Sequence, residues 1–341
     1  MVYYRQNKFF VNRSVERFTR LPLFAKKQML LTGQRLGDLM ATAADARGGL
    51  FLGGDRKLQP IWRAISFFIL AGFVLVPLIG YLTTLIIPPP PGPGLHLTPT
   101  ELAIVEIVNF LAALIATALF AWYEHRRIDS YGLPINAAFK SPTWEGFAVG
   151  VAQVAVVGLA MFALGGMQVH GLALGGTAIA TSALAWLAAC ICVGLGEEFL
   201  IRGYFLQTLW KAIGFWPAAG VIAVIFAGIH YLLKPGENVP DMLALMSFSL
   251  LCCYSVLRTG NLWFAVGLHI AYDFMQLFVI GTPNGGQIPP GRLLDATFNG
   301  PAWLTGGSLG TEANWFAVPL DLLAFAYIWW RYRSNRDYRP G

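Results

Sequence analysis

The amino-acid sequence predicts an all-α protein, a polytopic membrane helix bundle of about eight transmembrane helices. Hydrophobic residues make up 56% of the 341-residue chain and charged residues only 12%, whereas soluble proteins carry roughly 25% charged residues. The apolar residues gather in runs of about 20, the length that a helix needs to cross a bilayer. The basic residues lie almost entirely at alternate ends of these runs, as expected for a multi-pass protein.

Eight apolar runs account for the predicted spans. In order, they cover about residues 64–87, 101–123, 145–164, 177–196, 215–233, 241–257, 262–280 and 315–330. We expect the fourth run to continue as helix through residues 197–210, because the apolar pattern resumes directly after a short charged stretch. Glu106 lies in the second run about one turn from the membrane interface, and we expect no functional role for it.

The distribution of Lys and Arg predicts which loops face the cytoplasm. If both termini are cytoplasmic and all eight runs cross, 22 of the 24 basic residues lie in inside segments, Arg202 and Lys211 among them. Lys234 and Arg292 are the two that fall outside. This asymmetry satisfies the positive-inside rule. The net charge of +6 therefore reflects membrane topology, and we expect no nucleic-acid partner.

One charged stretch interrupts the apolar pattern at Glu197-Glu198-Phe199-Leu200-Ile201-Arg202. A charge in the membrane interior costs about 2.5–3.5 kcal/mol on insertion scales, so function is the first explanation to consider. Glu198 and Arg202 are four residues apart and can pair on one helical face. A surface ion pair at the end of a span is the alternative. Glu197 points about 100° away around the helix and has no basic residue three or four positions away.

Two further apolar runs carry ionisable side chains. His230 lies in the fifth run, and His269 and Asp273 are four residues apart on one face of the seventh. Hydrogen-bonded structural roles are the alternative, but they leave the cost of burying several polar groups unexplained. We expect these residues and Glu197 to converge on one water-accessible cavity that opens toward the cytoplasmic half of the membrane. Such a group of carboxylates and imidazoles can perform general acid–base catalysis.

The depth of these residues and the remaining motifs bear on this hypothesis. His230 ends a span that runs outward, so we expect tilted, long or broken helices around the cavity.

The sequence contains no His-Glu-x-x-His motif. We interpret the four cysteines as core residues, since they lie in apolar runs without zinc-site spacing: Cys190, Cys192, Cys252 and Cys253. Three alternatives to acid–base catalysis by these residues alone remain: a proton- or ion-coupled transporter, a non-catalytic scaffold or immunity protein, and a zinc protease.

Taken together, the motifs resemble those of a known family. The resemblance is to the CAAX-protease and bacteriocin-processing family of intramembrane glutamic endopeptidases, and it is carried by Glu197-Glu198-x-x-x-Arg202, Phe226-x-x-x-His230 and His269-x-x-x-Asp273. It covers about residues 145–280, and the eukaryotic relative is the Ras-converting CAAX endopeptidase. The resemblance implies a protease without metal or cofactor that hydrolyses a peptide bond of a membrane-associated protein or peptide. Because many relatives are bacterial, it also implies the bacterial plasma membrane as the location.

The resemblance also implies roles for individual residues. Glu197 would activate the hydrolytic water, and His230 would assist it. His269 and the residue at position 273 would stabilise the oxyanion. Three further residues would support the site, with the arginine holding the second glutamate and the local helix: Glu198, Arg202 and Phe226.

Position 273 departs from the eukaryotic pattern. The eukaryotic form has Asn where this chain has Asp273. An ionised Asp cannot donate a hydrogen bond to an oxyanion. We therefore expect Asp273 to orient His269 or to be protonated within the membrane.

The predicted organisation has four segments. Residues 1–60 form a basic cytoplasmic segment, in which residues 26–40 have the apolar spacing of an interfacial helix, with a poorly ordered tail as the alternative. Residues 61–140 hold two additional transmembrane helices, and residues 141–280 hold the catalytic membrane core. Residues 281–341 comprise an extracytoplasmic loop, the last transmembrane helix and a basic cytoplasmic tail.

Overall fold

The computed structural model describes residues 49–53, 55, 57–89 and 97–341. The interfacial helix predicted over residues 26–40 lies outside the described residues. The chain divides after Trp62 into two units, which are described separately. In the first unit, the described residues fold back onto Trp62, whose indole nitrogen donates to the carbonyl oxygen of Leu50 at 2.8 Å.

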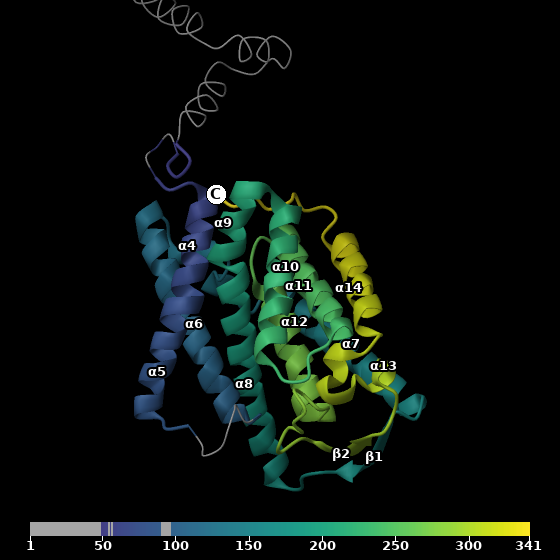
Figure 1. Cartoon of the computed structure of the whole chain (residues 1–341). Coiled ribbons are helices and arrows are strands. Elements are labelled where there is room, and N and C mark those ends of the chain that lie inside the picture. Colours follow the sequence, from purple (N-terminus) through teal and green to yellow (C-terminus); the bar gives the residue numbers. More distant parts are fainter. Residues whose placement is uncertain (1–48, 54, 56, 90–96) are drawn as a thin grey trace, which may run out of the picture. The chain divides into compact units, whose positions relative to one another are not determined.

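The described chain contains seven helical segments that are long and apolar enough to cross a membrane, which confirms the predicted polytopic bundle. The first segment joins α4 (Pro60–Phe68), η1 (Ile69–Leu75) and α5 (Val76–Ile86). The others are formed by α6 (Pro99–Glu124), α7 (Ser141–Ala163), α8 (Thr177–Arg202) with α9 (Tyr204–Ile213), α10 (Phe215–Leu233), α11 (Val239–Thr259) and α12 (Trp263–Asp273) with η4 (Phe274–Ile280). Figure 1 shows α6 to α12 running side by side. The protein is therefore a multi-pass membrane protein.

The first segment changes its helical geometry near its middle. Residues Ile69–Leu75 form a π-helix between α4 and α5. Pro77 lies two residues after this π-helix and lacks the N–H that would bond to the carbonyl four residues earlier. A wider turn is a common response to such a missing bond, and π-turns occur frequently at functional sites.

The eighth predicted span is present as a shorter helix. α14 (Ala317–Arg331) has 15 residues, fewer than the roughly 20 that cross a bilayer without tilt or thinning. The tail after α14 returns to the loop between α6 and α7, where Arg126 donates to the carbonyl oxygen of Gly341 at 2.6 Å. Arg63 lies at this same end, paired with Glu124 at 2.7 Å. Arg63 in the first span and the last residue of the chain therefore lie at the same end of the bundle.

The fourth span is unusually long and is broken at one glycine. α8 ends at Arg202, and α9 begins at Tyr204. A Cβ added at Gly203 would lie 2.4 Å from the carbonyl oxygen of Phe199, so the break accepts only glycine without rearrangement. Because the helix continues into α9, Glu197 lies within the bundle and not at its end. Figure 1 also shows α10 ending short of the far end of α8, which brings the last turn of α10 inward. The long, broken helix expected from the sequence is thus present.

Small residues allow α7 and α12 to pack closely. An added Cβ would lie 2.0 Å from the carbonyl oxygen of Phe264 at Gly146 and 2.4 Å from that of Leu268 at Gly150. This contact holds α12 rigidly against α7. It therefore fixes the helix that carries His269.

A small sheet lies at the opposite end of the bundle from Gly341. β1 (Met167–Leu172) pairs antiparallel with β2 (Leu294–Phe298). After β2, the chain forms α13 (Ala302–Thr305) and η5 (Gly307–Ala313) before it enters α14. Two short 3₁₀ turns, η2 (Ile128–Tyr131) and η3 (Ile135–Ala137), lie in the loop between α6 and α7. The sequence does not predict β1 and β2, because strands this short carry little periodicity.

Candidate active site

Three helices carry the predicted site residues. Glu197 and Glu198 lie in the last two turns of α8, and His230 lies in the last turn of α10. His269 and Asp273 lie in the second half of α12 and are buried, with 6% and 8% of their surface exposed. The structure thus brings residues separated by up to 76 positions into one region of the bundle.

Glu198 is at the centre of this region. Its Oε1 accepts a hydrogen bond from Arg202 at 2.8 Å and another from His269 Nδ1 at 2.9 Å. Glu198 and Arg202 are both fully buried, so the alternative of a surface ion pair is wrong. The Arg202 guanidinium also donates to Ser249 at 2.8 Å and lies 4.7 Å from the centre of the Phe226 ring. The predicted supporting residues are therefore in contact with one another.

The burial of Arg202 corrects the charge count. We counted Arg202 among the basic residues of the inside loops, but it lies within the bundle as the partner of Glu198. Without it, the inside count falls from 22 to 21, against two outside. The asymmetry that predicts the topology is unchanged.

His269 is held by Glu198, and Asp273 lies farther away. Because a carboxylate accepts hydrogen bonds, His269 Nδ1 is the donor to Glu198. Its Nε2 lies 3.8 Å from Glu197 Oε2 and 3.7 Å from Asp273 Oδ2. We expected Asp273 to orient His269, but 3.7 Å exceeds a hydrogen-bond length. The orientation of the ring comes from Glu198, and its Nε2 faces two carboxylates.

His230 has a fixed tautomer when it is neutral. Its Nδ1 lies 2.9 Å from the carbonyl oxygen of Phe226, which can only accept. The proton therefore resides on Nδ1, and Nε2 is left as an acceptor. The ring also packs 4.6 Å from the Phe226 ring.

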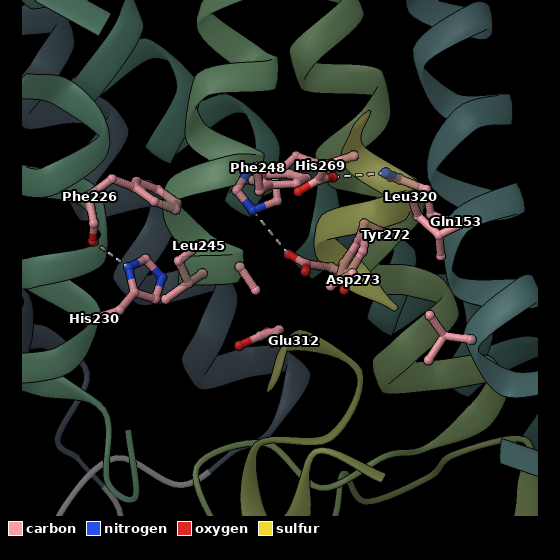
Figure 2. Close-up of a pocket in the computed structure, with 14 residues that line it drawn as sticks. Gln153, Phe226, His230, Leu245, Phe248, His269, Tyr272, Asp273, Glu312 and Leu320 are labelled. Atoms are coloured by element: carbon pink, nitrogen blue, oxygen red, sulfur yellow. Dashed lines mark hydrogen bonds and ion pairs between the residues drawn. The ribbon is translucent and has the colours of Figure 1, made fainter. Parts of the chain in front are cut away.

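Two hollows meet at His230, and this corrects the expectation of one common cavity. A cavity of about 50 Å³ is lined by His230, His269 and Asp273, which surround it in Figure 2. This volume is enough for several water molecules. Glu197 lines a separate apolar pocket of about 390 Å³ together with His230. Phe226 and His230 belong to both walls, so Glu197 approaches the group from the side of the apolar pocket.

Two residues that the sequence analysis missed extend the polar group. Gln276 donates from Nε2 to Asp273 Oδ1 at 3.2 Å and to Glu312 Oε1 at 2.7 Å. Glu312, on η5, lines the 50 Å³ cavity, and Figure 2 shows it across from His230 and Asp273. Gln276 lies three residues after Asp273 on the same helical face, a signal that the sequence offered. Glu312 lies in a Gly-rich loop, where no spacing pointed to it.

Glu312 forms an ion pair with Lys234 that shifts the pKa values of both groups. Burial alone would lower the pKa of Lys234, but the Glu312 carboxylate outweighs it and raises that pKa. Burial alone would raise the pKa of Glu312, but Lys234 outweighs it and lowers that pKa. Both groups are therefore charged at neutral pH.

Two further sequence features, Glu106 and a serine motif in η5, do not add a catalytic group to this site. Glu106 is 5% exposed and accepts a hydrogen bond from Asn109 at 3.2 Å, so its carboxylate is held between helices of the bundle. A Gly-x-Ser-x-Gly sequence occurs at residues 306–310, but it lies largely in the 3₁₀ segment η5 and exposes Ser308. A nucleophile elbow needs a strand-to-helix turn, so this motif gives no alternative nucleophile.

Comparison with known proteins agrees with the motifs. Residues 178–275 match the family model described as type II CAAX prenyl endopeptidase Rce1-like. No curated protein matches the chain. The matched segment carries every predicted site residue, and the resemblance inferred from the motifs is confirmed for this segment as an Rce1-like domain. The Rce1-like family is a protease family, so the match supports a CAAX-type intramembrane protease at the level of the family.

Proposed function

We propose that this protein hydrolyses a peptide bond of a membrane-associated protein or peptide with a water molecule that Glu197 and His230 activate. One observation carries the proposal: these two side chains, from different helices, line the same apolar pocket of about 390 Å³. The volume lies within the usual range for ligand pockets. Glu197 Oε2 is buried and has no hydrogen-bond partner among the described residues, so its capacity to accept a hydrogen bond is unused.

The proposed reaction begins with the water between the two side chains. The Glu197 carboxylate removes one proton, and the neutral His230 Nε2 accepts a hydrogen bond from the other. The water oxygen attacks the carbonyl carbon and forms a tetrahedral oxyanion. The C–N bond then breaks, and Glu197 returns its proton to the leaving amine. No metal or cofactor takes part in this sequence.

His269 is the proposed donor to the oxyanion. Its Nδ1 donates to Glu198, so Nε2 can donate only from the doubly protonated ring. The carboxylates of Glu197, Glu198 and Asp273 surround the ring and favour this charged form. A preorganised donor of this kind is worth about 2.7–4 kcal/mol in the transition state of acyl transfer.

The apolar pocket favours a substrate with an apolar chain near the scissile bond. Aromatic and aliphatic side chains from the first span and from α10 make up most of its wall, including Phe67, Phe73 and Leu232. The matched family model is described as a prenyl endopeptidase, and a lipid-modified substrate would suit such a wall. We propose that the substrate enters with its apolar part in this pocket.

Glu197→Gln tests the proposal, because it keeps the shape of the side chain and removes the base. Purified wild-type and variant protein in bilayer discs would be given a membrane-tethered fluorogenic peptide. We expect kcat to fall by about 10²–10⁴-fold, the usual contribution of a general base, with the thermal unfolding temperature retained. Glu101→Gln, at the start of α6, is the matched control and should cleave like the wild type. Unchanged cleavage by Glu197→Gln would refute the proposal.

A further inference from the structure

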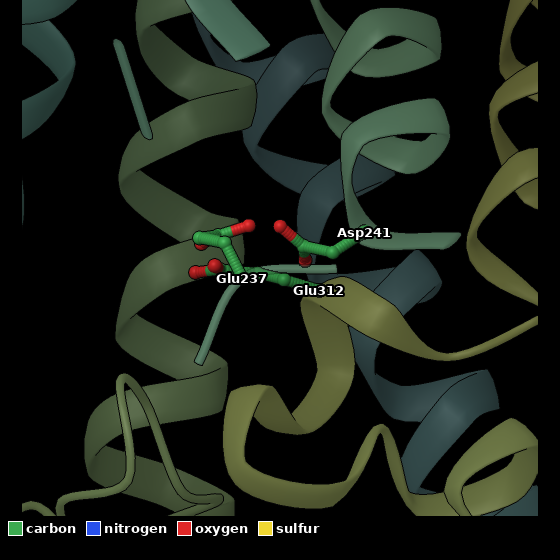
Figure 3. A group of neighbouring side chains, drawn as sticks. All are labelled: Glu237, Asp241 and Glu312. Carbon is green, nitrogen blue, oxygen red and sulfur yellow. The ribbon is translucent and has the colours of Figure 1, made fainter. Parts of the chain in front are cut away.

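Three carboxylates gather just beyond the last turn of α10, in the half of the bundle opposite to Gly341 (Figure 1). Glu237 comes from the loop between α10 and α11, Asp241 from the first turn of α11, and Glu312 from η5. One oxygen from each lies within 4.8 Å of the others, and Figure 3 shows the three groups close together. All three are separate from the Glu197 side of the active site.

Two of these carboxylates are buried without hydrogen-bond partners. Asp241 has no exposed surface, and neither of its oxygens has a hydrogen-bond donor among the described residues. The Glu237 side chain is 1% exposed, and its oxygens likewise have no donor there. A buried charge without a partner is strongly unfavourable. The two side chains thus call for a positive group that would lie between them.

Lys234 supplies only part of the positive charge that these buried carboxylates require. Its ammonium pairs with Glu312 and lies 3.7 Å from one oxygen of Glu237. With all three carboxylates ionised, as an ion bound between them would require, one positive charge leaves an excess of two negative charges. A divalent cation would balance that excess.

We propose that Glu237, Asp241 and Glu312 bind a calcium ion. The ligands are all oxygens, which selects hard cations. Two ligands on opposite sides of Ca²⁺ lie about 4.8 Å apart at a Ca–O distance of about 2.4 Å, whereas those of Mg²⁺ lie about 4.2 Å apart. The three oxygens lie within 4.8 Å of one another, which either ion could span, and Ca²⁺ is favoured because Mg²⁺ usually keeps several waters and binds only one or two carboxylates. Water would complete the six to eight oxygens that Ca²⁺ requires.

The ion would join two segments that are distant in the sequence. Glu237 and Asp241 belong to the connection between α10 and α11, and Glu312 belongs to the long segment after α12. Glu312 also lines the cavity beside His230, so the ion would hold one wall of that cavity in place. The charge distribution predicts that this end faces the outside, where sites with a Kd of about 10⁻⁴–10⁻³ M are usefully occupied.

Calcium titration of the purified full-length protein tests the proposal without reference to protease activity. After chelator treatment, the thermal unfolding temperature and the heat of binding would be followed as CaCl₂ is added. We expect a saturable rise in unfolding temperature with Ca²⁺ and a smaller one with Mg²⁺ at the same concentration. Asp241→Asn and Glu237→Gln should weaken Ca²⁺ binding by about tenfold or more, because charged ligands set the affinity of such sites. Asp295→Asn, an exposed acid on β2, is the control and should bind like the wild type.

Two results would overturn the calcium site. One is no binding and no shift with Ca²⁺ up to about 10 mM, tenfold above the weak end of the usual range. The other is an unchanged shift in both Asp241→Asn and Glu237→Gln, which would place any bound ion elsewhere. If Asp241→Asn instead raises the unfolding temperature in the absence of Ca²⁺ and the wild type binds none, a proton shared by the carboxylates relieves their repulsion, and the proposal is wrong. Because the readout is binding, failure of the protease hypothesis leaves this test unaffected.

Discussion

Replacing Glu198 by Gln removes the negative charge that Arg202 and His269 share. The wild-type carboxylate is fully buried and accepts hydrogen bonds of 2.8 Å and 2.9 Å from these two residues. The amide oxygen of Gln can still accept, so the shape of the contact survives. The change therefore isolates the effect of the charge and leaves the Arg202 guanidinium buried without a counterion.

The expected cost follows from this geometry. Removing one partner of a buried ion pair costs about 3–5 kcal/mol, because the remaining charge is uncompensated. We expect the low end, about 3 kcal/mol, since hydrogen bonding to the amide is retained. At about 2–4 °C per kcal/mol for chains of 150–250 residues, the unfolding temperature would fall by at most about 6–12 °C. The double variant Glu198→Gln/Arg202→Met removes both charges, and we expect it to recover most of the loss.

Thermal unfolding in detergent, followed by intrinsic fluorescence, would measure both variants. The comparison between single and double variant matters most, since neighbouring residues do not contribute additively. An unfolding temperature of Glu198→Gln equal to that of the wild type would refute the buried ion pair. A double variant that is less stable than Glu198→Gln would show that Arg202 contributes mainly by packing, contrary to the reasoning.

Three further predictions concern the site, the topology and an ion pair. Asp273→Asn should retain kcat/KM within about tenfold, because an Asn oxygen can still accept the hydrogen bond from Gln276. A loss of activity as large as that expected for Glu197→Gln would contradict this. Reporter fusions at Pro91 and Lys140 should report opposite sides of the membrane, and both on one side would refute the predicted topology. The Lys234–Glu312 ion pair should stabilise the protein fully between about pH 4.3 and pH 10.4. Because folding lowers the pKa of Glu312 and raises that of Lys234, this stabilisation is lost as the pH falls below the window and as it rises above it. Unfolding temperatures of the wild type and Lys234→Met should differ most inside this window and converge below and above it; an equal difference inside and outside the window would contradict the assignment.

Local spacing in the sequence predicted the contacts within single helices. The pair of Glu198 and Arg202 follows from their separation of four residues. Apolar runs likewise predicted the spans. These features depend on helix periodicity, which a sequence displays directly.

Contacts between distant segments were beyond such reasoning. The bond from His269 to Glu198 spans 71 positions, and the bond from Gln276 to Glu312 spans 36. Their existence depends on how α8, α12 and η5 pack, which no local pattern encodes. The separation into two hollows beside His230 is of the same kind, since it depends on which side of α10 each neighbouring helix covers.

The origin of the oxygen atom in the first product tests the central proposal most directly. Metal-depleted wild-type protein, in excess over a membrane-tethered peptide, would be allowed one turnover in ¹⁸O-labelled water and analysed by mass spectrometry. If Glu197 and His230 activate water for direct attack, cleavage proceeds after metal removal and the new carboxyl group carries one ¹⁸O atom. No cleavage until a transition metal is restored would contradict the account. So would an unlabelled product with ¹⁸O on Glu197, because that result requires direct attack by the glutamate itself.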